Sequence, residues 1–203
     1  MKNILVLFGS ILLMLSCNTD NTSLEMSGEN EKSKPVANIS DESIFNLSSK
    51  WRTEENDEIE LSNLKGKVLV MVMIYTTCKV ACPRLVADMK NIELQVSEET
   101  NTNIQYVLVS IDPKNDTPEK LKAFAIEKEM DGDEWTFLHG NEETVREFAN
   151  VLAVKYKEIS PMDFSHSNII SVFNPMGELV HQQEGLGVDN KETVKIIIET
   201  AKQ

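Results

Sequence analysis

The chain has 203 residues, a length that holds one ordinary domain with appendages better than two full domains. Hydrophobic residues make up 41% and charged residues 26%, which indicates a globular protein rather than a disordered or fibrous one. The formal net charge of −13 argues against unaided binding to nucleic acid or to anionic lipid headgroups, because both carry dense negative charge.

The first 17 residues have the features of an export signal. Lys2 is followed by an apolar run over residues 4–15, too short to span a bilayer as a helix, and then by Ser16 and Cys17. A small residue before a cysteine at the end of such a run resembles a bacterial lipobox, whose cysteine is lipidated and becomes the first mature residue. We predict a lipoprotein anchored through Cys17, with an ordinary cleaved signal peptide as the alternative. In both cases the domain is extracytoplasmic, and the lipid form is attached to a bacterial membrane facing the periplasm.

Residues 18–45 are expected to form a flexible tether. The segment is rich in Asn, Ser, Glu and Asp and poor in large apolar residues, so it buries too little surface to offset the entropy lost on ordering. A random coil of this length has a mean reach of roughly 30 Å. Residues 46–203 remain as the folded domain, held near the membrane by the tether.

The first half of the domain is expected to alternate strands and helices. Residues 51–64 are predicted to form a hairpin, and the uninterrupted apolar run over 67–75 predicts a strand buried on both faces. Pro83 suits the first turn of a helix, so a helix is predicted to start there. A second apolar strand covers 104–111, and Thr117 then begins another helix.

The second half of the domain changes character. Asn141 is predicted to begin a short helix, because Glu142 and Glu143 follow it at the positive end of the helix dipole. A hairpin is predicted from strands at 168–174 and 178–182, and a last helix covers 191–202. The order of elements predicts an α/β, thioredoxin-like fold, with a central mixed sheet flanked by helices, an N-terminal extension and an inserted helix.

The chemistry is expected at Cys78 and Cys82, which lie in TTCKVACPR between the central strand and the following helix. Open α/β sheets usually bind ligands at this end of a strand. Two thiols in an exported protein often form a structural disulfide, but a bridge over so few residues restricts the unfolded chain little. Because Pro83 disfavours helical geometry at Cys82, we expect both thiols in a loop that runs into the first turn of the helix. The helix N-terminus, Lys79 and Arg84 should favour the thiolate, which redox chemistry and metal binding both need.

Two features favour metal binding over disulfide exchange. The spacing is C-x-x-x-C rather than the C-x-x-C of thioredoxin-like oxidoreductases. The segment MDFSHSNIISVF also lacks the proline that thioredoxins place against their dithiol, and it offers His166 instead. Two thiolates and one imidazole suit Cu(I) and tolerate Cu(II), whereas zinc usually takes four ligands in a closed site.

Several separated motifs resemble the Sco/SenC family of copper-binding assembly factors for the CuA centre of respiratory oxidases: CKVACP, VSIDPKNDTPEKL, WTFLHG and DFSHSNI. The resemblance covers residues 46–203 and implies that Cys78, Cys82 and His166 are copper ligands. It also implies a role near the copper loop, or toward a partner, for Asp112. The family loop usually reads C-P-x-x-C-P with an acidic residue after the first proline, and here Lys79 and Val80 replace that proline and acid.

The resemblance implies a copper chaperone rather than an enzyme in the usual sense. The expected partner is the CuA-containing subunit of a respiratory oxidase, or nitrous oxide reductase given the changed loop, together with a thiol reductant protein. The main alternative is a thiol–disulfide reductase that uses Cys78 and Cys82 to keep the CuA cysteines of the target reduced. A peroxiredoxin-like peroxidase is disfavoured, because the surroundings of Cys78 lack that family's proline and threonine arrangement.

Three further polar residues have simpler interpretations. His139 is expected to be structural, and His181, on the second strand of the hairpin, is expected to face solvent. Asp116 precedes Thr117 and Pro118, so helix capping explains it without any role at the site.

Overall fold

The computed structural model describes residues 40–203 except residues 80, 101, 102 and 162. The predicted signal peptide, the lipidation site at Cys17 and most of the predicted tether lie outside the described residues. Within the described part of the chain, no helix is long and apolar enough to cross a membrane.

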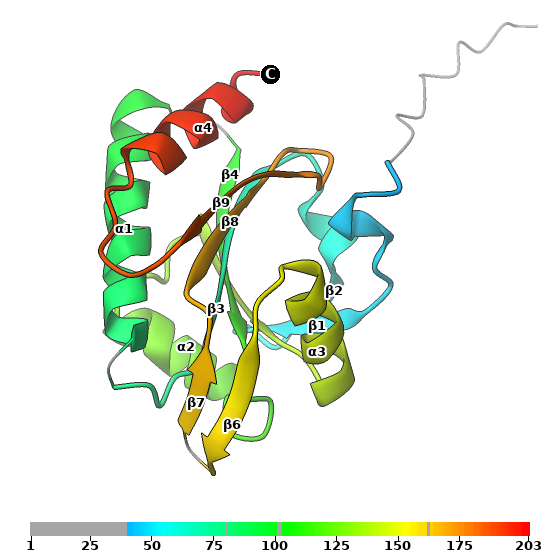
Figure 1. Cartoon of the computed structure of the whole chain (residues 1–203). Coiled ribbons are helices and arrows are strands. Elements are labelled where there is room, and N and C mark those ends of the chain that lie inside the picture. Colours follow the sequence, from blue (N-terminus) through cyan, green and yellow to red (C-terminus); the bar gives the residue numbers. More distant parts are fainter. Residues whose placement is uncertain (1–39, 80, 101–102, 162) are drawn as a thin grey trace, which may run out of the picture. The chain divides into compact units, whose positions relative to one another are not determined.

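A seven-stranded mixed sheet forms the centre of the domain, with the strand order β2-β1-β5-β4-β3-β8-β9. Helices cover both faces, and Figure 1 shows α1 and α4 on one side of the sheet and α3 on the other. This arrangement confirms the predicted α/β class with a central mixed sheet. The strands of the main sheet are β1 (Lys50–Thr53), β2 (Glu58–Glu60), β3 (Val68–Ile74), β4 (Ile104–Ser110), β5 (Trp135–His139), β8 (Ile169–Phe173) and β9 (Leu179–Glu184). The helices are α1 (Ala81–Glu99), α2 (Pro118–Glu127), α3 (Glu142–Val151) and α4 (Lys191–Ala201), with short 3-10 turns η1 (Ile44–Asn46) and η2 (Leu61–Leu64).

Strand β3 is the buried centre of the sheet, as its continuous apolar run predicts. All seven of its residues are buried. It pairs parallel with β4 and antiparallel with β8, and Val72 lies between Leu108 and Ile170. Side chains on both faces of the strand are therefore removed from water, which is the reason that the run contains no polar residue.

Two helices begin where their capping residues predict. The Thr117 side chain accepts a hydrogen bond from the backbone N–H of Lys120, and Pro118 opens α2. The Asn141 side chain accepts from the N–H groups of Glu143 and Thr144 at the start of α3. Each cap satisfies N–H groups that have no acceptor within the helix.

Helix α1 begins at Ala81, two residues before the predicted start at Pro83. Cys82 therefore lies within the first helical turn, and the prediction that Pro83 keeps it out of helical geometry is wrong. The reason is that the first N–H groups of a helix have no acceptor within it, so Pro83 removes no helical hydrogen bond at this position.

Strand β5 was not predicted as a strand. It lies between β4, with which it is parallel, and β1, with which it is antiparallel. The segment WTFLH is short, and its two neighbours come from distant parts of the chain, so its pairing is decided by tertiary contacts rather than by a local pattern.

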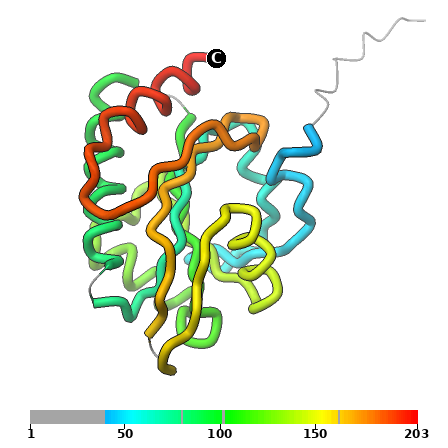
Figure 2. The backbone as a smooth tube through the Cα atoms, viewed as in Figure 1, coloured from blue at the N-terminus to red at the C-terminus, as the bar shows by residue number. Residues whose placement is uncertain are grey.

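A second, two-stranded sheet consists of β6 (Tyr156–Ser160) and β7 (Asp163–His166), and it was not predicted either. Most of its residues are exposed or half-buried, so the sequence lacks an alternating apolar signal. In Figure 2 this hairpin extends at the bottom of the view, on the side away from the C-terminal helix. It ends at His166, three residues before β8 begins.

The packed region starts before residue 46, the predicted boundary of the folded domain. Ile44 and Phe45 are 2% and 6% exposed, and the N–H of Ile44 donates to the carbonyl of Gly177 at 2.9 Å. The turn between β8 and β9 thus anchors the chain segment that enters the domain.

The contact at Gly177 predicts a difference between two glycines. Both Gly66 and Gly177 have positive φ values, so alanine at either position should cost about 1 kcal/mol of unfolding free energy. A Cβ at Gly177 would also lie 2.8 Å from the Phe45 ring, whereas a Cβ at Gly66 would have nothing within 4 Å. Gly177→Ala should therefore lower the unfolding free energy by about 1–2 kcal/mol more than Gly66→Ala does. Urea unfolding followed by tryptophan fluorescence measures both losses. Equal losses would contradict the proposed packing of Phe45.

Candidate metal centre

The pairing of β3 brings three segments to one edge of the sheet. Because β4 is parallel to β3 and β8 is antiparallel to it, the ends of β3 and β4 and the start of β8 lie together. The segment with Cys78 follows β3, the loop with Asp112 and Asp116 follows β4, and His166 precedes β8. In the sequence, Cys78 lies 34 positions before Asp112 and 88 positions before His166, and only the sheet makes them neighbours.

The two cysteines and the histidine meet at this edge. Cys82 Sγ lies 3.9 Å from His166 Nε2, and the backbone N–H of Cys82 donates to Cys78 Sγ at 3.2 Å. Both cysteines carry thiols rather than a shared disulfide. Cys82 is 1% exposed, whereas Cys78 is half-buried. The three residues predicted as copper ligands are therefore brought together, one of them in the interior and one near the surface.

The site is not closed around a single point. Among the described residues, no three side chains of His, Cys, Asp or Glu are already arranged to hold one metal ion. Cys82 Sγ and His166 Nε2 are nevertheless close to each other, and Cys78 Sγ lies beside the backbone of Cys82.

The imidazole of His166 has a defined proton position. Its Nδ1 lies 3.0 Å from the carbonyl oxygen of Ser167, which only accepts hydrogen bonds, so Nδ1 carries the proton and donates it. The lone pair of Nε2 is then directed to the side of Cys82. Burial lowers the pKa of His166, which keeps the ring neutral and able to bind a metal at neutral pH.

A family model described as SCO1/SenC matches residues 45–202. The chain belongs to the SCO1/SenC family. A SCO1 protein homolog of Bacillus subtilis is 27% identical over 139 residues, which cover 67% of this chain and 72% of the relative.

Solved structures of Sco proteins have the same fold. Arabidopsis thaliana ScoI with copper bound superposes with a TM-score of 0.68 at 18% identity, covering 76% of this chain and 96% of that one. BsSco, described as a member of the Sco family of cytochrome c oxidase assembly proteins, has a TM-score of 0.67 at 24% identity and covers 75% and 91%. The predicted thioredoxin-like fold is thereby confirmed.

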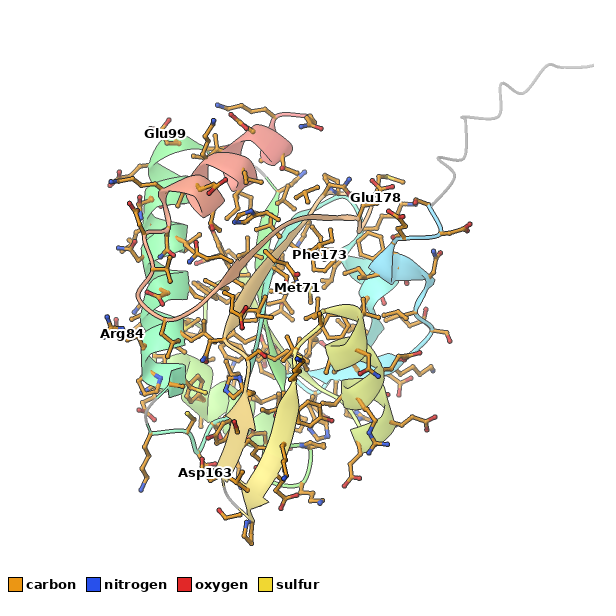
Figure 3. All side chains as sticks on the ribbon, viewed as in Figure 1. Met71, Arg84, Glu99, Asp163, Phe173 and Glu178 are labelled. Carbon is orange, nitrogen blue, oxygen red and sulfur yellow. The ribbon has the colours of Figure 1, made fainter. Side chains whose placement is uncertain are left out.

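The thiol chemistry of this SCO1/SenC domain differs from the prediction at one residue. Burial raises the pKa of Cys82 well above its ordinary value, so the expected stabilisation of its thiolate is wrong. The expected cations do not offset this effect. Lys79 is exposed, and the Arg84 guanidinium lies against the backbone at Gly187, on the outer side of α1 in Figure 3. Binding of a metal at Cys82 must therefore displace a proton.

The carboxylate that supports the cysteine segment belongs to Asp116, not to Asp112. Asp116 is fully buried and accepts hydrogen bonds from the Thr76 N–H at 3.0 Å, from the Ser110 hydroxyl at 2.7 Å and from the Thr76 hydroxyl. It thus fixes the backbone just after β3. The predicted capping role at α2 is fulfilled by Thr117 instead.

The Asp112 carboxylate is directed into its own loop. It accepts hydrogen bonds from the side chain of Asn115 at 2.8 and 3.1 Å and from its backbone N–H at 3.2 Å. Asp112 also lines a cavity of about 490 Å³ together with Lys114 and Arg146, beside the site rather than in it. Its part in partner binding stays a prediction.

Two other histidines have structural contacts. His139 Nδ1 lies 2.7 Å from the carbonyl oxygen of Asp116, in agreement with a structural role. His181 Nε2 lies 3.0 Å from the Thr193 hydroxyl of α4, and the residue is half-buried, so the expectation that it faces solvent is wrong.

Asp116 predicts a pH dependence of stability. Burial raises its pKa in the folded protein above the ordinary value of 3.8, so the folded state holds this proton more tightly than the unfolded state. Its contribution is then fully present below pH 3.8 and is lost as the pH rises through the folded pKa.

The expected result is that Asp116→Asn, which cannot ionise, gains stability relative to the wild type across this pH window. Urea unfolding of both proteins at several pH values measures the difference, and the many other carboxylates cancel in it. A difference that does not change with pH would contradict the raised pKa.

Proposed function

We propose that this chain binds copper through Cys78, Cys82 and His166 outside the cytoplasm and delivers it to the CuA-containing subunit of a cytochrome c oxidase. The observation that carries the proposal is the approach of Cys82 Sγ to His166 Nε2 at 3.9 Å, beside Cys78. Copper is the cargo of this protein, and the chain contributes the ligands and the means of exchanging them.

The chemistry of the donors fits copper. Two sulfur ligands favour the soft ion Cu(I), and a neutral imidazole with a defined proton position extends the set to Cu(II). The solved structure of Arabidopsis ScoI has copper bound, which supports copper as the metal of the present chain. Zinc fits less well, because its structural sites usually have four protein ligands.

The different exposure of the two thiols suits transfer rather than storage. Cys82 is buried, whereas Cys78 lines a surface cavity of about 860 Å³ together with residues of α2 and of the β6–β7 hairpin. An incoming ligand from a partner reaches Cys78 first, so exchange of the metal begins there.

A respiratory oxidase is the partner that the family supports. BsSco is described as belonging to a family of cytochrome c oxidase assembly proteins, and the separated sequence motifs resemble the same family. Nitrous oxide reductase, which also contains CuA, is the second candidate target, because Lys79 and Val80 depart from the loop of the family. Pull-down with each CuA subunit separates the two targets.

A competition titration with Cu(I) under anaerobic conditions tests the ligand set. Cys78→Ser and Cys82→Ser should each weaken binding by more than the roughly 10–100-fold that the loss of an outer-shell partner costs, because each removes a thiolate ligand. His166→Ala should weaken binding less than either, since two thiolates still hold Cu(I). His181→Ala is the matched control and should bind copper like the wild type.

The titration also separates the proposal from the reductase alternative. Tight copper binding that survives both cysteine substitutions would overturn the proposed site. Fast reduction of a CuA-subunit disulfide by a protein that binds copper only weakly would favour the thiol–disulfide reductase.

We also propose that Cys17 carries a lipid that attaches the protein to the membrane. The support is the short apolar run followed by Ser16 and Cys17, with no other cysteine before Cys78. Cys17→Ser should abolish labelling by radioactive palmitate and move the protein from the membrane fraction to the soluble extracytoplasmic fraction. Cys78→Ser is the control and should stay in the membrane fraction. Membrane retention of the Cys17→Ser protein would contradict the anchor.

A further inference from the structure

The β6–β7 hairpin, which supplies His166, is attached to the domain in an unusual way. Its two strands pair with each other and with no strand of the seven-stranded sheet. Among the described residues, no backbone hydrogen bond joins the hairpin to the cysteine segment. Side-chain contacts between the two therefore contribute to the position of the imidazole.

Tyr75 makes several of these contacts. It follows β3 directly and is 2% exposed. Its ring lies against the Phe164 ring, with centroids 5.2 Å apart, and against the imidazole of His166, at 5.8 Å in an edge-to-face arrangement. The Tyr75 side chain, at the end of the central strand, thus contacts both His166 and Phe164 of the hairpin.

The Tyr75 hydroxyl contacts polar groups of both the hairpin and the cysteine segment. It lies 2.6 Å from Asp163 Oδ1 and 3.1 Å from the carbonyl oxygen of Phe164. It also forms a hydrogen bond with the side chain of Cys78. Asp163 opens strand β7, three residues before His166, and its place on the hairpin is visible in Figure 3.

In the contact between Tyr75 and Asp163, the hydroxyl donates and the carboxylate accepts. A phenol has one proton to donate, and the short distance to Asp163 marks a charge-assisted hydrogen bond to the carboxylate. The oxygen lone pairs of Tyr75 remain for the Cys78 side. The hydroxyl therefore connects the segment that carries Cys78 with the strand that carries His166.

We propose that Tyr75, through its hydrogen bond to Asp163, is the positioning residue that holds the β6–β7 hairpin against the cysteine segment and so sets the distance from His166 to Cys82. The effect on copper binding rests on the proposed function, whereas the contact that holds the hairpin can be tested in the metal-free protein. Tyr75 and Asp163 are not themselves metal ligands in this proposal. They act on the metal by fixing the imidazole.

The first test uses the full chain without metal. Tyr75→Phe keeps the ring contacts and removes the hydroxyl, whereas Asp163→Ala removes the acceptor from an exposed position and leaves the core intact. Both variants should increase amide hydrogen exchange within residues 156–166, because the hairpin loses its connection to β3. Asp163→Asn keeps an oxygen acceptor and should exchange more slowly than Asp163→Ala.

The second test adds copper to the same proteins. Tyr75→Phe and Asp163→Ala should each lower Cu(I) affinity by about tenfold, the lower end of the range for the loss of an outer-shell partner. They should also change the thiolate-to-Cu(II) absorption band and the electron paramagnetic resonance spectrum, which respond to ligand geometry. The double variant should lose no more than Tyr75→Phe alone, because removal of the Tyr75 hydroxyl already abolishes its hydrogen bond to Asp163.

Tyr106→Phe is the matched control, because Tyr106 is equally buried but packs on Trp135 at the far end of β4. It should leave hairpin exchange and the copper spectra unchanged. Wild-type exchange in residues 156–166 of both Tyr75→Phe and Asp163→Ala would overturn the inference. If the wild type fails to bind copper while exchange rises as expected, the proposed function fails and the positioning role of Tyr75 remains.

Discussion

The location of the metal centre depends on one constraint, which is that β3 pairs parallel with β4 on one side and antiparallel with β8 on the other. This pairing brings the segment after β3 and the segment before β8 to the same edge of the sheet. All seven residues of β3 are buried, so the strand lies within the hydrophobic core together with both of its neighbours. The hydrophobic core therefore fixes the position from which Cys78, Cys82 and His166 approach one another.

The site combines the buried thiol of Cys82 with the more accessible thiol of Cys78, and this difference affects both protonation and access. Burial raises the pKa of Cys82 and lowers that of His166, so both of these candidate ligands are favoured in their neutral forms. In the proposed copper site, metal binding would require proton release from Cys82, so copper affinity would depend on pH. Cys78 lines the surface cavity and is the more accessible of the two thiols. A site with these properties is better suited to passing a metal on than to retaining it.

Polar groups outside the ligand set support each part of the site. Asp116 holds the backbone at Thr76, just after β3, by accepting three hydrogen bonds. Tyr75 contacts Asp163 and the ring of His166. Each of these supports joins segments that are about 40 or about 90 residues apart in the chain, so that the site depends on the folded domain for its geometry. Outer groups of this kind orient metal ligands in many proteins.

The sequence by itself determined the features that depend on neighbouring residues. The apolar run of β3 and the caps at Thr117 and Asn141 were readable, because periodicity and capping act within a few positions. Cys78, Cys82 and His166 were predicted as ligands from separated motifs that resemble a known family. Only the tertiary structure decided that β5 fills the gap between β4 and β1, and that a separate hairpin presents His166. It also decided that Asp116, rather than Asp112, touches the cysteine segment, and that burial keeps Cys82 protonated. These outcomes depend on which distant segments remove a group from water or offer it a partner, and no local pattern encodes that choice.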